Sequence, residues 1–146
     1  MRHLRVLIML ALSLGTTGAG AELPKPAPVL PEALHWFAVP NNDRLQGAWV
    51  LGAEKEAGTY VLRVRLASGG RIPAHTHPDT RYSTVLSGTL YVGFGELANE
   101  TDVVAVPEGG VYVAPAGVPH YLWARDGDVV YQEGGVGPTA TVPVKR

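Results

Sequence analysis

The chain has 146 residues, 46% of them hydrophobic, which is enough for one domain with a sizeable core. Its 12 basic residues nearly balance its 13 acidic ones, so we do not expect nucleic acid as a partner, because non-specific affinity for it depends on clustered Lys and Arg. The chain has no cysteine, which excludes disulfides, thiolate catalysis and thiolate metal ligands. A reactive site must therefore be built from histidine, carboxylate, arginine, tyrosine and backbone groups.

Residues 1–21 have the pattern of a secretory signal peptide. Basic residues at Arg2 and Arg5 precede an apolar stretch over 6–14, and small residues at 19–21 form a cleavage site. The apolar stretch is well short of the roughly 20 residues that a membrane-spanning helix needs. We therefore expect a cleaved signal and an exported protein, periplasmic or extracellular, without a membrane anchor; the alternative is an uncleaved apolar helix.

Residues 22–33 are rich in proline and predict an extended lead-in before a single domain over 34–146. Within that domain short apolar segments alternate with turns rich in Gly, Pro, Asn and Asp. The apolar residues recur with period two, as in Leu62, Val64 and Leu66, and no segment holds a period of 3.6. We expect strands at about 34–39, 47–52, 58–67, 71–77, 81–86, 89–94, 102–106, 110–114, 119–125, 128–133 and 138–144. Such regular short strands predict an all-β sandwich or barrel.

Two stretches carry most of the chemistry. In the first, residues 69–88, His75 and His77 are two apart in a predicted strand, so both imidazoles point to the same face. Neutral imidazoles are good ligands for transition metals, although a lone pair of this kind is more often an ordinary hydrogen-bonded pair. In the second stretch, residues 109–120, a turn, a short apolar strand and a Pro/Gly turn lead to His120.

Together the two stretches resemble the two motifs of the cupin family. The matching positions are Gly69, His75, His77 and Gly88 in the first motif, and Gly109, Pro115, Gly117 and His120 in the second. The resemblance covers about residues 58–133 and implies a jelly-roll barrel, also called a double-stranded β-helix. It also implies that His75, His77 and His120 meet at the barrel mouth and bind a divalent transition metal.

Two positions depart from the family pattern. Arg81 stands where the first motif has a glutamate ligand, and Ala124 stands where the second motif has asparagine. A guanidinium cannot ligate a metal, and at an effective dielectric near 20 its charge about 5 Å from a divalent ion costs on the order of 6 to 7 kcal/mol. Arg81 therefore either holds an anion beside the metal or points away as a surface residue. In a third alternative Asp79 replaces the missing ligand, which the turn at Pro78 disfavours.

Two further positions bear on the site. Tyr82, next to Arg81, is a second candidate catalytic residue if its hydroxyl faces the histidines, whereas most strand tyrosines serve packing. Gln132 and Glu133 lie on a late strand that in cupins runs near the site. By alternation one of the two faces inward, and the sequence leaves open which one.

Three classes of function remain open. The favoured one is a metal-dependent enzyme of oxygenase or isomerase/lyase type, in which the three histidines hold zinc, iron, manganese, copper or nickel and Arg81 fixes a small anionic molecule. The second is a cupin that binds a sugar or an anion without turnover. The third is a structural or sensory module whose barrel mouth has lost its chemistry. The resemblance also implies a homodimer that pairs through sheet edges.

Overall fold

Eleven short strands and one 3₁₀ turn make up residues 27–145, the part of the chain that the computed structural model describes. The elements are η1 (Pro31–Ala33), β1 (Phe37–Val39), β2 (Asn42–Leu51), β3 (Gly58–Leu66), β4 (Arg71–Thr76), β5 (Arg81–Ser87), β6 (Thr89–Phe94), β7 (Val104–Pro107), β8 (Val111–Ala114), β9 (His120–Trp123), β10 (Val129–Gly137) and β11 (Val142–Pro143). Every predicted strand is present. The signal-peptide prediction lies outside the described residues.

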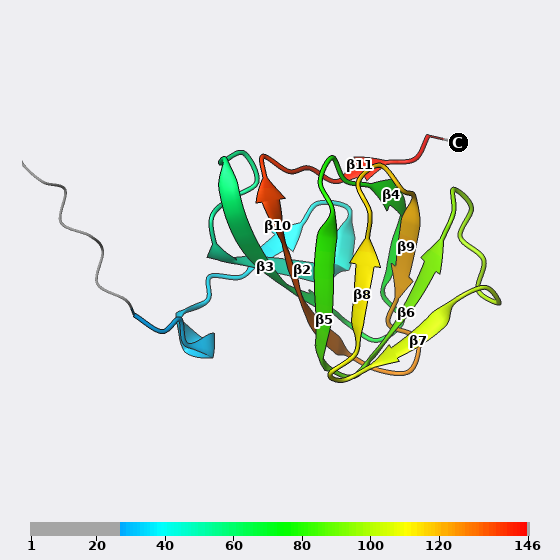
Figure 1. Cartoon of the computed structure of the whole chain (residues 1–146). Coiled ribbons are helices and arrows are strands. Elements are labelled where there is room, and N and C mark those ends of the chain that lie inside the picture. Colours follow the sequence, from blue (N-terminus) through cyan, green and yellow to red (C-terminus); the bar gives the residue numbers. More distant parts are fainter. Residues whose placement is uncertain (1–26, 146) are drawn as a thin grey trace, which may run out of the picture.

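The strands form two antiparallel sheets that face each other (Figure 1). The six-stranded sheet has the order β1-β2-β3-β10-β5-β8, and the five-stranded sheet has the order β11-β4-β9-β6-β7. This arrangement confirms the all-β jelly roll that the sequence and the family resemblance predict. The described residues include no helix long and apolar enough to cross a membrane.

The core lies between the two sheets, as the period-two alternation requires. On β3, Tyr60, Val64 and Leu66 are buried, while Arg65 between them is exposed. The buried core cluster consists of Val64, Leu66, Val85, Leu90, Val92, Val106, Tyr112, Ala114, Leu122, Ala124, Val129 and Tyr131. Ala124, which replaces the second motif's asparagine, is thus a core residue.

Several strand boundaries differ from the prediction, and two of these differences have a clear structural reason. The strand β2 begins at Asn42 instead of residue 47, because Asn41 adopts a left-handed φ of 62° and closes a tight turn after β1. The strand β10 continues to Gly137 because it pairs with β3 along its full length. The short turn η1 was not predicted; the chain around it, residues 27–36, runs away from the barrel (Figure 1).

The motif glycines mark turns between strands. Gly69, Gly88, Gly109 and Gly117 all have φ between 72° and 79°, the left-handed region that favours glycine. Gly88, between β5 and β6, has a second constraint: a Cβ there would lie 2.3 Å from the carbonyl oxygen of Asp128. These turns fix where β4 and β9, the strands that carry the histidines, enter the sheet.

Candidate metal centre

The structure brings the three predicted histidines together at one end of the barrel. His75 lies in β4, directly across the sheet from His120 at the start of β9, and His77 follows β4 by one residue. All three side chains are buried, and their ligand atoms lie within 4.8 Å of one another. We call His75, His77 and His120 the three-histidine cluster. Its geometry allows all three imidazoles to bind one metal ion.

Backbone carbonyls fix the tautomer of each imidazole. The Nδ1 atoms of the cluster lie 2.7 Å, 2.7 Å and 3.1 Å from the carbonyl oxygens of Pro73, Ala140 and Val118. A carbonyl only accepts, so each Nδ1 must carry the proton and each Nε2 must present a lone pair.

The Nε2 atoms of His77 and His120 are buried and have no hydrogen-bond partner among residues 27–145. Buried polar atoms are costly when unpaired, and a lone pair held in place by a hydrogen bond on the opposite ring nitrogen is the usual arrangement of a metal-ligating histidine. The donor set therefore fits a transition metal.

The cluster is neutral near pH 7. Burial lowers the pKa of His75 to about 4 and that of His77 to about 3, and it also lowers the pKa of His120. The positive charge of Arg81 adds to each of these downward shifts. Protons compete with metal ions for the imidazole nitrogens. Imidazoles that are already neutral can therefore bind an ion without first losing a proton.

Arg81 is only 4% exposed, so the interpretation of this residue as a surface arginine is wrong. Its Nη1 donates to Glu133 at 2.6 Å and its Nη2 donates to Thr139 at 2.9 Å. Glu133 is therefore the member of the 132/133 pair that faces inward, while Gln132 accepts a hydrogen bond from Arg63. The Glu133 carboxylate counters burial and raises the pKa of Arg81, and it offsets part of the repulsion that a bound cation would meet.

Asp79 has partners of its own and is not one of the clustered metal-binding groups. Its carboxylate accepts hydrogen bonds from the hydroxyls of Tyr60 and Thr139. Thr139 in turn accepts from Arg81, so these side chains form a continuous polar network. The network satisfies Asp79 and argues against its use as a replacement ligand.

The structure does not bring Tyr82 to the histidines. Tyr82 is 61% exposed and alternates with the buried Arg81 on β5, so its side chain lies on the outer face of the sheet. It stands opposite Val113 of β8, which is also exposed. An acid or base role for Tyr82 in this site therefore has no geometric support.

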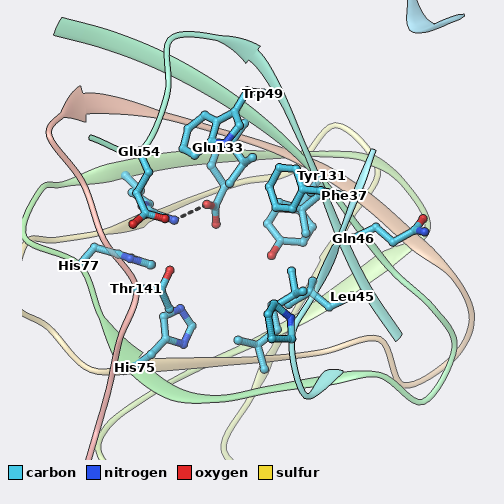
Figure 2. Close-up of a pocket in the computed structure, with 17 residues that line it drawn as sticks. Phe37, Leu45, Gln46, Trp49, Glu54, His75, His77, Tyr131, Glu133 and Thr141 are labelled. Carbon is cyan, nitrogen blue, oxygen red and sulfur yellow. Dashed lines mark hydrogen bonds and ion pairs between the residues drawn. The ribbon is translucent and has the colours of Figure 1, made fainter. Parts of the chain in front are cut away.

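A cavity of about 280 Å³ opens beside His75 and His77 (Figure 2). It is lined by Phe37, Val39, Pro40, Leu45, Gln46, Gly47, Trp49, Glu54, Leu62, Val64, Ile72, His75, His77, Arg81, Tyr131, Glu133 and Thr141. Sequence reasoning missed the contribution of β1 and β2 to this wall. The alternation of Leu45, Gly47 and Trp49 was a signal for one inward face, but it could not show that this face borders a cavity.

Comparison with known proteins places these features in a family. Residues 62–136 match the family described as Cupin domain. A germin-like protein, subfamily 2 member 4, from Arabidopsis thaliana is 45% identical over 97 residues, which cover 61% of this chain and 43% of that protein. The aligned part thus spans less than half the length of the curated relatives it matches.

Solved structures share the fold at low sequence identity. The polyketide cyclase RemF from Streptomyces resistomycificus superposes with a TM-score of 0.70 at 13% identity, covering 83% of this chain and 87% of that one. The DMSP lyase DddQ from Ruegeria pomeroyi DSS-3 superposes with a TM-score of 0.64 at 18% identity, covering 79% and 64%. With the family match spanning half of its residues, this chain belongs to the cupin family.

Proposed function

We propose that this cupin binds one divalent transition metal through the Nε2 atoms of the three-histidine cluster and uses it in a reaction on a small anionic molecule. The observation that carries the proposal is the fixed tautomer: three buried Nδ1 atoms face backbone carbonyls, so three Nε2 lone pairs are left for an ion. Imidazole ligands suit zinc, iron, copper and nickel, and the proposal extends to manganese.

The charges around the cluster support an anionic ligand. The imidazoles are neutral, and Glu133 balances the charge of Arg81. A divalent ion would place positive charge at the surface of the cavity, where an anion can bind it directly, and the carboxylates of Asp79 and the exposed Glu54 would offset part of that charge.

A reaction of oxygenase or isomerase/lyase type is the favoured use of the site. A bound ion would supply Lewis acidity toward a carbonyl or hydroxyl of the substrate. The residues of this chain would hold the ion, exclude bulk water from one side of it and keep a charged arginine and carboxylate beside it. Support comes from the structural neighbours whose names are those of a cyclase and a lyase. Binding without turnover remains the alternative.

Elemental analysis of the untagged protein, purified without chelators or added metal, tests the metal site. We expect close to one transition-metal ion per chain, lost in His77→Ala and retained in the matched variant His35→Ala, because His35 is exposed and outside the cluster. Wild-type protein without metal, or a metal content that His77→Ala leaves unchanged, contradicts the proposal. If metal is present but no turnover is found with small anions, the binding alternative replaces the enzyme.

Export is a second part of the proposal and rests on the signal pattern of residues 1–21 alone. Expression of the full chain followed by N-terminal sequencing of the exported protein tests it. We expect the mature chain to start at Glu22. A protein that stays in the cytoplasm with Met1 or Arg2 at its N-terminus would rule out the signal peptide.

A further inference from the structure

The cavity beside the three-histidine cluster has two chemically different ends. Its polar end consists of His75, His77, Arg81 and Glu133, and Figure 2 shows Glu54 and Thr141 on the same side. The wall away from that end is hydrocarbon, contributed by Phe37, Val39, Pro40, Leu45, Trp49, Leu62, Val64, Ile72 and Tyr131. In Figure 2 the labelled Phe37, Leu45 and Tyr131 lie together on one side, and the histidines lie on the other. Metal binding by itself requires no such wall.

Much of the hydrocarbon wall comes from the hairpin of β1 and β2. This hairpin precedes residues 62–136, the segment that matches the cupin family. Phe37 is 41% exposed although it lines the cavity, which puts its ring at the rim. Its position depends on Gly47 opposite it: a Cβ on Gly47 would lie 2.5 Å from the Cζ atom of Phe37.

The polar end has an unused hydrogen-bond donor. The Nε of Arg81 is buried and has no partner among the described residues, although both terminal nitrogens are occupied. An N–H of a guanidinium is a strong donor to an anion, and a buried one left unpaired is costly. An anionic group at this end of the cavity would meet the positive charge of Arg81, one of the lining residues, in addition to the proposed metal.

We infer that the ligand is a small organic anion with an apolar body, such as an aryl or branched alkyl group, seated against the β1–β2 wall. The inference that its anionic group points toward the three-histidine cluster rests on the proposed function. The volume of about 280 Å³ is near the lower end of small-molecule sites, which suits a body of one ring.

A sugar acid fits the same cavity poorly. Each sugar hydroxyl buried against hydrocarbon loses its hydrogen bonds to water, which is costly unless the protein replaces them. On the side away from the histidines, the lining side chains able to replace them are Gln46, Trp49 and Tyr131, against a wall that is otherwise aliphatic or aromatic carbon. The wall therefore selects for an apolar body and against a polyhydroxylated one.

The test compares two probes of equal charge, phenylacetate and glucuronate, by calorimetric titration of the protein as purified with its metal. We expect phenylacetate to bind at least about tenfold more tightly than glucuronate, because its ring buries apolar surface on the wall. Phe37→Ala and Trp49→Ala should each weaken phenylacetate binding about fivefold and leave glucuronate binding unchanged.

Gly47→Ala, which displaces the Phe37 ring, is a third variant of the same wall. Leu97→Ala is the matched control, since Leu97 is 75% exposed and does not line the cavity.

Metal content measured on the same samples separates two kinds of failure. Protein that contains metal but binds glucuronate as tightly as phenylacetate, or binds neither, overturns the inferred ligand class and leaves the metal site intact. Protein without metal that still prefers phenylacetate, with the loss in Phe37→Ala, supports the ligand class and contradicts the proposed metal site. Phenylacetate binding that none of the three wall variants changes also overturns the inference.

Discussion

Position 81 separates this chain from the family pattern in which a glutamate completes the metal site. The guanidinium of Arg81 is buried against Glu133, a residue 52 positions later in the chain. A motif that spans residues 69–88 could flag the missing ligand but could not identify this partner. Alternation predicted that residue 132 or 133 faces inward, and only the pairing of β10 with β5 decides for Glu133. The chemistry at position 81 therefore depends on tertiary structure.

A double-mutant cycle measures what the buried ion pair contributes. Arg81→Gln leaves the Glu133 carboxylate buried without its cation, and we expect a loss of about 3 to 5 kcal/mol in the free energy of unfolding. Glu133→Gln should cost a similar amount, and the double variant should lose less than the sum of the two. Urea unfolding of the four proteins provides the measurement. Strict additivity would show that the two side chains do not interact.

The three-histidine cluster predicts how the metal-free protein responds to acid. An imidazole in an unfolded chain has a pKa near 6.5, whereas in the folded chain the pKa is about 4 for His75 and about 3 for His77. Between these values the unfolded state binds more protons, so stability is present above about pH 6.5 and falls as the pH drops.

Unfolding of chelator-treated protein by urea between pH 7.5 and pH 4.5 checks this prediction. We expect the free energy of unfolding to fall by up to about 1.4 kcal/mol per pH unit for each buried histidine. His35→Ala should follow the same profile as wild type, because His35 is exposed. A profile that stays flat down to pH 4.5 would mean that these imidazoles are not buried in the neutral form.

The sequence predicted where the strands lie, but it did not predict where each strand begins and ends. Alternation and turn residues located all the strands, because both signals are local. The start of β2 depends on the left-handed turn at Asn41, and the end of β10 depends on its partner β3. The cavity wall from the β1–β2 hairpin was missed for the same reason: local patterns show which face is apolar, not what it faces.

Two motif glycines with equal backbone geometry give a matched test of how the turns work. Gly88 and Gly109 have φ values of 78° and 79°, but a Cβ on Gly88 would lie 2.3 Å from a backbone oxygen whereas a Cβ on Gly109 would meet nothing within 4 Å. We expect Gly109→Ala to cost about 1 kcal/mol for the backbone conformation alone. Gly88→Ala should cost at least about 1 kcal/mol more, because backbone must also move. Equal losses in thermal unfolding would contradict this account of the β5–β6 turn.

At the scale of the whole molecule, the homodimer expected from the family resemblance stays a prediction. The outer face of β5 and β8 exposes Tyr82, Leu86, Val111 and Val113, and β8 is an edge strand of its sheet. Contiguous exposed apolar surface often marks an interaction site. Light scattering of the purified protein should give the mass of two chains, and Val113→Asp should give the mass of one. A monomeric wild-type protein would contradict the prediction.

Only part of the candidate site could be predicted from the sequence. The resemblance to the cupin motifs implied which histidines meet, whereas spacing alone predicted only that His75 and His77 share a face. The sequence did not indicate the tautomers, since these depend on the carbonyls of Pro73, Val118 and Ala140, whose positions only the folded chain sets. It also placed Tyr82 among the candidates, although the structure puts that side chain on the outer face.

The most direct test of the central claim is ¹⁵N NMR of the histidine side chains at pH 7 during a titration of metal-free protein with Zn²⁺. Before metal is added, we expect His75, His77 and His120 to be neutral and protonated at Nδ1. Their Nε2 resonances should then shift together and saturate at one equivalent of Zn²⁺, while His35 does not change. Protonation at Nε2 in the metal-free protein, or a response from fewer than three of these residues, would contradict the three-histidine metal site.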